Sequence, residues 1–147
     1  MKFSATRKFS TTVLLLAFLM ILPGVRADES NQATRVTFSE AVQIPGHVLP
    51  AGTYWFILPD NLTDHDQVRI YNADRTIFYG TVITITAQRL QATDKSAFTF
   101  TAQDSTQPQA LVSWFYPGET LGHRFLYPKQ VSKELAKSKQ VTVVAGD

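Results

Sequence analysis

The ten residues from Leu49 to Leu58 constrain the fold of this 147-residue chain more than any other segment. Pro50 fixes one turn dihedral and Gly52 accepts a positive φ, so the chain is able to reverse there. The residues that follow are aromatic, β-branched or aliphatic, which is the composition of a well-buried strand. Both faces of that strand are apolar, with Tyr54, Phe56 and Leu58 on one and Trp55 and Ile57 on the other. We therefore expect a central strand, covered on both faces, around which other strands pair.

The N-terminus has the three parts of a secretory signal peptide. The basic residues Lys2, Arg7 and Lys8 precede an apolar run at 13–22, and small residues then occupy the two positions that a signal peptidase reads in Val25-Arg26-Ala27. An uncleaved anchor is the alternative, but ten apolar residues are too few to span a bilayer. We expect cleavage between Ala27 and Asp28. The mature chain is then a single domain of residues 28–147 without a transmembrane segment.

Cleavage changes the charge of the chain. The full sequence has 14 Lys and Arg residues against 12 Asp and Glu residues, but four of the cations lie within residues 1–27. The mature chain therefore has a net charge of −2, and it lacks the cationic field that nucleic-acid binding requires. The chain has no cysteine, so an exported domain of this kind is held by burial alone, which favours a bacterial envelope or secreted protein.

Short alternating segments with turn signals between them follow one another along the mature chain. The most secure local prediction is a hairpin of residues 68–71 and 76–86 around an Asn/Asp turn at 72–75. Seven or eight such strands predict an all-β, antiparallel β-sandwich, immunoglobulin-like or prealbumin-like, with a small antiparallel β-barrel as the alternative. A parallel α/β fold is excluded because no helical stretch separates the strands. One helix is predicted at about 129–139, opened by Pro128.

Aromatic residues on the predicted strands have two interpretations. Trp55, Trp114 and Tyr116 are candidates for a ligand or partner surface, whereas aromatic residues on strands more often belong to the core. The second face of the central strand is covered either by the predicted helix or by such a partner. The lysines of that helix recur every four residues and form a cationic stripe, which we interpret as a solvated face.

Two groups of polar residues are candidate metal ligands. Asp60, Asp64 and Asp66 lie in one seven-residue loop and form a candidate calcium site, although such residues also dominate ordinary turns. The histidines at positions 47, 65 and 123 lie far apart in or beside predicted loops, and no pair has metal-ligand spacing. No cysteine, nucleophile elbow or glycine-rich phosphate loop is present, so we assign no catalytic residue and expect no cofactor.

Four segments together carry a resemblance to known proteins: residues 45–54 (PGHVLPAGTY), 70–76 (IYNADRT), 114–118 (WFYPG) and 125–129 (FLYPK). In this order they resemble a family of small exported β-rich proteins of soil-type bacteria. The resemblance implies a β-rich exported domain over nearly all of the mature chain. It brings no activity, cofactor or catalytic residue, because the motifs are turn and strand signatures.

These observations predict an exported, non-enzymatic binding or structural module of the bacterial envelope, periplasmic or extracellular. Its partner is a protein, a polymer or a small apolar ligand. The alternative is a carrier with an apolar cavity near Trp55 or Trp114. A third reading is a hydrolase whose histidine and acid meet only in the folded chain. A module instead needs an exposed patch or an unpaired strand edge.

Overall fold

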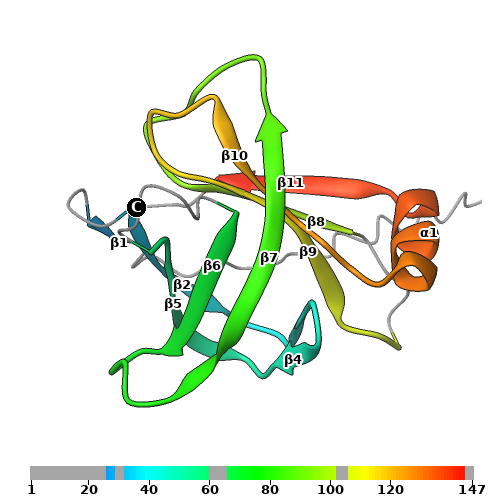
Figure 1. Cartoon of the computed structure of the whole chain (residues 1–147), viewed down its shortest axis with the longest axis horizontal. Helices are drawn as coiled ribbons and strands as arrows, with labels where there is room; N and C mark the ends of the chain where they lie inside the picture. Colours follow the sequence, from blue (N-terminus) through cyan, green and yellow to red (C-terminus); the bar gives the residue numbers. More distant parts are fainter. Residues whose placement is uncertain (1–25, 29–31, 60–65, 102–105, 145–147) are drawn as a thin grey trace, which may run out of the picture.

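The computed structural model describes residues 26–28, 32–59, 66–101 and 106–144, which form an all-β, sandwich-like fold with one short helix (Figure 1). The predicted fold class is therefore confirmed. The described strands are β1 (Arg26–Asp28), β2 (Ala33–Phe38), β3 (Val42–Ile44), β4 (His47–Leu49), β5 (Gly52–Ile57), β6 (Gln67–Asn72), β7 (Phe78–Gln88), β8 (Ala97–Thr101), β9 (Gln109–Phe115), β10 (Leu121–Phe125) and β11 (Gln140–Val144).

The strands form two layers that share the long strand β7. The first layer has the order β1-β2-β5-β6-β7, and the second has the order β7-β10-β9-β8-β11. The first half of β7 pairs with β6 and its second half pairs with β10 (Figure 1). Thr84 donates its N–H toward β6, to Asp66, while the neighbouring Ile83 carbonyl accepts from Leu126 on the other edge. A strand that passes from one sheet into the next forms a corner between them, and β7 has this role.

The short hairpin β3–β4 joins the layers on the opposite side. It continues the β2–β5 pair, and β3 also runs parallel to the start of β9, whereas all other pairings among the described strands are antiparallel. The hydroxyl of Tyr127 lies 2.7 Å from the Leu111 carbonyl oxygen and 3.0 Å from that of Gln43. One side chain thus ties β9 to β3 at the point where the two layers meet.

Aromatic rings from both layers fill the space between them. Phe38 of β2 lies 6.4 Å from Phe98 and 6.0 Å from Phe100 of β8, measured between ring centroids, and both pairs are nearly perpendicular. Phe56 of β5 makes similar contacts with Phe98 and with Trp114 of β9. Edge-to-face pairs contribute roughly 0.5–1.5 kcal/mol each beyond the burial of their area. The core is therefore a packed aromatic cluster between the layers.

The β-rich segments were placed correctly, but the predicted chain reversal at Pro50–Gly52 was wrong. The chain reverses at Gly46 instead, where φ is +81°, and β4 then continues into β5 on the same side of the hairpin. The hydroxyl of Tyr54 donates to the Pro50 carbonyl oxygen at 2.6 Å and fixes the bend between β4 and β5. A proline and a glycine permit several turns, and the pairing of β2 with β5 selects a bend here.

The structure has more strands than the seven or eight predicted. Beyond those runs it contains β1, β4 and β11, each only three to five residues long. Segments this short do not give an alternating pattern long enough to identify them. These segments become strands because β2, β3 and β8 each offer a free edge to pair with.

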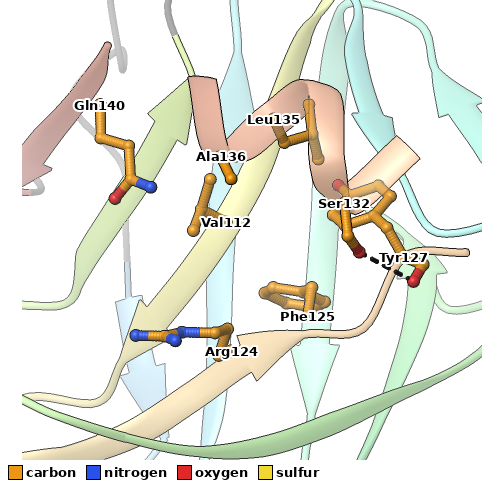
Figure 2. Close-up of a pocket in the computed structure, with 8 residues that line it drawn as sticks. All are labelled: Val112, Arg124, Phe125, Tyr127, Ser132, Leu135, Ala136 and Gln140. Carbon is orange, nitrogen blue, oxygen red and sulfur yellow. Dashed lines mark hydrogen bonds between the residues drawn. The ribbon is translucent and has the colours of Figure 1, made fainter. Parts of the chain in front are cut away.

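The predicted helix is present as α1 (Lys129–Lys137), two residues shorter than expected. Pro128 is the residue before the first turn rather than part of it, and the helix ends where the Ser138 N–H bonds the Leu135 carbonyl oxygen. Leu135 is the buried residue of the helix and points toward β9 and β10 (Figure 2). The helix therefore covers the second layer and not the outer face of β5.

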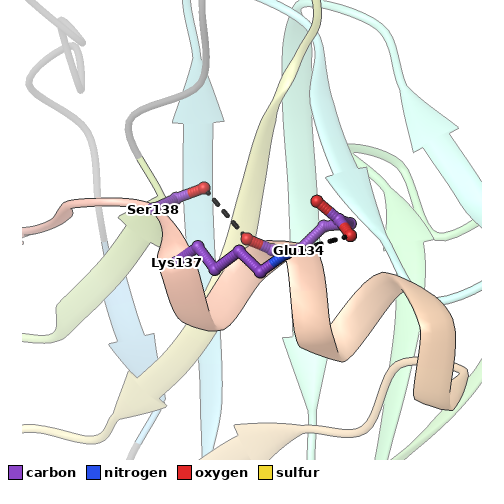
Figure 3. A network of polar contacts seen from close by, with 3 residues as sticks. All are labelled: Glu134, Lys137 and Ser138. Atoms are coloured by element: carbon purple, nitrogen blue, oxygen red, sulfur yellow. Dashed lines mark hydrogen bonds and ion pairs between the residues drawn. The ribbon is translucent and has the colours of Figure 1, made fainter.

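The lysine stripe of α1 lies in solvent. Lys137 forms an ion pair with Glu134 at 3.6 Å, and the Ser138 hydroxyl donates to the Glu134 carbonyl oxygen (Figure 3). Both charged side chains are well exposed, so water and salt screen the pair and it contributes little to stability. No helix in the described part of the chain is long and apolar enough to cross a membrane.

We expect Tyr127→Phe to lower the free energy of unfolding by about 1–2 kcal/mol, because the two carbonyl oxygens at the junction of the layers lose the one hydroxyl donor that they share. Urea denaturation at pH 7 measures this cost. Tyr71→Phe is the control, because the Tyr71 hydroxyl makes no hydrogen bond with the described residues. An equal effect of the two substitutions would contradict the role of Tyr127.

The same variant has a pH signature. Burial raises the pKa of Tyr127 above its ordinary value of 10, so the folded state favours the neutral phenol. The stabilisation from this group is complete below pH 10 and is lost as the pH rises further, by up to about 1.4 kcal/mol per pH unit. Tyr127→Phe should remove that part of the alkaline loss. A series of urea titrations between pH 7 and 11 tests this.

Candidate functional site

The structure separates the three aromatic residues that were predicted to form a surface. Trp114 is 0% exposed, contacts Phe56 and His123, and belongs to the core. Tyr116 is partly buried and packs against the same core. Of the two interpretations of Trp114, its burial supports the core, because its side of β9 faces the first layer. Trp55 is partly exposed on the outer face of β5, away from the core, and remains a surface candidate.

The candidate metal ligands are placed only in part. Asp60, Asp64 and His65 lie outside the described residues, and Asp66 uses its carbonyl oxygen to accept the Thr84 N–H. Within residues 26–28, 32–59, 66–101 and 106–144, no three His, Asp or Glu side chains gather as metal ligands would. The calcium site stays a prediction because two of its three carboxylates fall outside these ranges.

The described histidines have separate surroundings. His47 is exposed at the β3–β4 turn and lines a cleft of about 360 Å³ beside the start of α1. The His123 ring lies against the buried indole of Trp114, with Nδ1 3.2 Å from the Thr84 hydroxyl. The two histidines thus belong to different faces of the molecule.

Trp55 belongs to a row of side chains that crosses the outer face of the first layer. The pairing register places Trp55 opposite Tyr71 on β6, and Tyr71 opposite Phe78 on β7. The rings of Tyr71 and Phe78 lie 5.1 Å apart, and Phe78 is 54% exposed. We call Trp55, Tyr71 and Phe78 the aromatic face. A shift in register after Ile70, next to Gly80, brings Phe78 into the row, and the glycine within β7 is the local sequence signal of such an irregularity.

The turn between β6 and β7 holds the aromatic face in place. The Asn72 side-chain oxygen accepts the N–H groups of Thr76 and Ile77 at 2.8 and 2.9 Å, and its amide donates to the Thr76 hydroxyl. Arg75 adopts a left-handed conformation with φ of +58° in this turn. A left-handed residue is common in a turn that an Asn side chain organises. This conformation directs the Arg75 side chain back over the sheet.

Arg75 and the turn also fix the indole of Trp55. The Arg75 guanidinium carbon lies 4.2 Å from the ring centroid, and Trp55 Nε1 donates to the Ala73 carbonyl oxygen at 3.0 Å. A stacked guanidinium is attracted by the electrons of the ring face. Of the two predicted covers of the second face of β5, the helix lies elsewhere, and the chain's own arginine covers part of the face. A partner on this face stays a prediction.

The aromatic face is flanked by positive charge. Arg35 lies beside Trp55 in the pairing register, and Arg69 lies on the same face opposite Ile57. The guanidinium groups of Arg35 and Arg69 make no ion pair or hydrogen bond with the described residues. Arg75 also makes no ion pair with these residues. Aromatic and arginine side chains together are typical of interface centres. The surface is suited to a partner that is partly apolar and partly anionic.

A second candidate lies between α1 and the outer face of the second layer, and we call it the helix–sheet cleft. It has a volume of about 270 Å³ (Figure 2). Its main lining residues come from β9, β10, α1 and β11: Val112, Arg124, Phe125, Leu135, Ala136 and Gln140. At one end the Ser132 hydroxyl donates to the Tyr127 carbonyl oxygen at 3.0 Å. Sequence reasoning missed this site because its residues are scattered over 29 positions and no motif joins them.

The cleft continues along the sheet into a second lobe of about 250 Å³. Val112, Arg124 and Gln140 line both lobes, so the two are adjacent. The floor of the second lobe has hydroxyl groups, including the bonded pair Thr99 and Thr142 at 2.9 Å. Ser113 lies next to Thr99 in the register and opposite Arg124. Both lobes thus mix apolar and polar groups, and the second has the larger number of hydroxyl groups.

No protein-family model, curated protein or solved structure matches the chain. The candidate sites are therefore interpreted from their geometry.

We expect Asn72→Ala to loosen the turn beside the aromatic face. Two backbone N–H groups lose their acceptor, which should lower the free energy of unfolding by about 1–2 kcal/mol. The fluorescence of Trp55 should also shift toward that of a solvated indole, because Ala73 and Arg75 no longer hold it. Thr76→Ala is the control, since it removes only the bond from the Asn72 amide. Unchanged fluorescence in Asn72→Ala would contradict the supporting role of this turn.

Proposed function

We propose that this protein is an exported, non-enzymatic binding module of the bacterial envelope that contacts its partner through the aromatic face. The observation that carries this proposal is a row of aromatic side chains on the outer face of the first layer, beside arginines that make no ion pair with the described residues. Trp55 and its turn are held by hydrogen bonds and a stacked guanidinium in the absence of any partner. A preorganised surface loses little conformational entropy on binding, which favours affinity.

The chemistry of the aromatic face indicates the kind of partner. Apolar rings such as Phe78 favour a partner that also buries apolar surface, whereas Arg35 and Arg69 favour one that carries anionic groups. Anionic polymers and acidic protein surfaces of the envelope both combine these properties. Since exposed charges are screened by salt, binding should weaken as ionic strength rises.

Binding to isolated bacterial envelopes tests this function. We expect Phe78→Ser to reduce the fraction of protein that sediments with envelopes by about fivefold or more, because the most exposed ring of the face is lost. Leu121→Ser is the matched control, since Leu121 is equally exposed, at 55%, on β10. Equal binding of the two variants, or no dependence on salt, would contradict the role of the aromatic face.

Export is the second part of the proposal, and it rests on the signal-like N-terminal residues. We expect the full chain, expressed in a bacterium, to be recovered outside the cytoplasm with Asp28 as its first residue. N-terminal sequencing of the exported protein measures this. Ala27→Arg should block cleavage and leave the longer form, because the peptidase requires a small residue there. Recovery of the uncleaved wild-type chain in the cytoplasm would show that export is wrong.

Cleavage at this position also bears on the first layer. Arg26 and Ala27 form most of β1, so their removal leaves β2 as the outer strand of the layer. Val36 and Phe38 of β2 are buried in the core, and β2 pairs with β5 over its full length. The fold is therefore expected to persist in the mature chain, and the aromatic face lies on strands that cleavage leaves intact.

A second candidate function is the carriage of a small ligand. The helix–sheet cleft favours it, because a concave site with apolar walls and a few polar groups is typical of small-molecule binding. This differs from the carrier that the sequence suggested, whose cavity lay near Trp55 or Trp114. Neither tryptophan lines either lobe of the cleft.

A further inference from the structure

Arg124 is the distinctive group of the helix–sheet cleft. It lies on β10 and lines both lobes, and its side chain extends away from Phe125 (Figure 2). It makes no hydrogen bond or ion pair with the described residues. Among the described residues, no Asp or Glu side chain lines either lobe. An arginine without a counter-charge beside a concave surface is suited to an anion, since its planar fork binds a carboxylate through two hydrogen bonds.

Arg89, which also lines the second lobe, stabilises the neighbouring loops. Its side chain donates to the carbonyl oxygen of Glu119 at 2.9 Å and to the Thr93 hydroxyl at 3.0 Å. Its guanidinium also lies over the ring of Phe115, at 4.8 Å from the centroid. These contacts fasten the segment after β7 to the turn before β10. Arg124 is therefore the arginine available to a ligand.

Apolar side chains line the middle of the first lobe. Leu135 and Ala136 of α1 point down toward Val112 of β9 and the ring of Phe125, while Ser132 and Tyr127 lie at one end (Figure 2). Gln140 lines both lobes, and the Ser113 hydroxyl lines the second lobe, on the other side of Arg124. An occupant of both lobes thus meets a charge at its middle, an apolar surface on one side and hydroxyl groups on the other.

We propose that the helix–sheet cleft binds a small amphiphile with a single acyl chain and a carboxylate head, such as a free medium-chain fatty acid. The carboxylate lies on Arg124 with Ser113 and Gln140 beside it, and the chain lies between Val112, Phe125 and α1. Two lobes of this size together fall within the range of small-molecule sites, roughly 300–1,000 Å³. This inference deepens the second candidate function and is independent of the aromatic face.

The few contacts between α1 and the sheet are compatible with the insertion of an acyl chain. The helix buries one residue, Leu135, and is fastened at its ends, by Tyr127 before it and by the pairing of β11 with β8 after it. A chain inserted beneath it adds apolar contacts to a helix that has few. Ligand binding should therefore protect the helix from exchange with solvent as well as bury the ligand.

Calorimetric titration of the purified protein with decanoate, below its micellar concentration, tests the proposal. We expect saturable binding of one decanoate per chain. Arg124→Gln should weaken it by roughly tenfold or more, because a charge-assisted pair is lost. Ala136→Phe should also abolish binding by filling the apolar lobe. Arg69→Gln is the control, since it removes an exposed arginine from the first layer. Hydrogen exchange of residues 129–137 should slow on addition of decanoate in the wild-type protein.

Comparison ligands identify the chemistry. Decanol has the same chain without the charge and should bind at least tenfold more weakly than decanoate. Equal affinity of the protein for decanol and decanoate, or an unchanged affinity for decanoate in Arg124→Gln, would overturn the role of Arg124. Absence of decanoate binding would overturn the inference altogether, as would association only with vesicles of anionic phospholipid, which would indicate a membrane surface.

The two proposals are distinguished by crossed variants. Phe78→Ser should bind decanoate as the wild-type protein does, and Arg124→Gln should retain binding to envelopes. If only Phe78→Ser loses binding to envelopes, the result supports the role of the aromatic face and says nothing of the cleft. If Arg124→Gln and Phe78→Ser both lose decanoate, the ligand does not lie in the cleft and the inference is wrong. Thermal unfolding of each variant confirms that it is folded, which we expect because Arg124 and Phe78 are exposed.

Discussion

The aromatic contacts between the two layers are the interaction on which the rest of the structure depends. Phe38 and Phe56 from the first layer meet Phe98, Phe100 and Trp114 from the second in edge-to-face pairs. These rings fill the interior, so the inner faces of both sheets are committed to packing. The corner strand β7 and the Tyr127 hydroxyl hold the layers together at opposite sides. Any binding is therefore expected on the outer faces, and both candidate sites lie there.

The two outer faces carry different chemistry on the same scaffold. On the first layer a turn organised by Asn72 supports exposed rings, and on the second layer α1 stands over a cleft with Arg124 at its centre. Both sites are positively charged although the mature chain is expected to have a net charge of −2. The net charge of a protein governs long-range attraction and solubility, whereas recognition depends on the charges near the binding surface. Salt screens contacts between nearby charges less than it screens long-range attraction. The exclusion of nucleic acid and the preference for smaller anionic partners are thus compatible.

The comparison of Trp55 with Trp114 shows how far sequence reasoning reaches. Both residues lie on predicted strands with apolar neighbours, and the sequence left surface and core open for each. In the fold, alternation places Trp114 toward the opposite layer and Trp55 away from it, since Tyr54 and Phe56 occupy the inner positions of β5. A strand pattern tells which residues share a face, but the face that is covered depends on what packs against it. The helix that was one candidate cover for β5 packs on the other layer, so Trp55 is left partly exposed.

By itself the sequence determined the β class of the fold, the hairpin of β6 and β7, the single helix after Pro128 and the strands that build the core. These features follow from turn residues and alternation, which act over a few residues. Only the tertiary structure decided which residues form the aromatic face and the helix–sheet cleft. The row depends on a register shift between β6 and β7, and the cleft on residues of three strands and a helix that meet through long-range pairing. Packing arises from contacts between segments distant along the chain, which local sequence patterns do not encode. A glycine within a strand, such as Gly80, marks the place of an irregularity without giving the register that results.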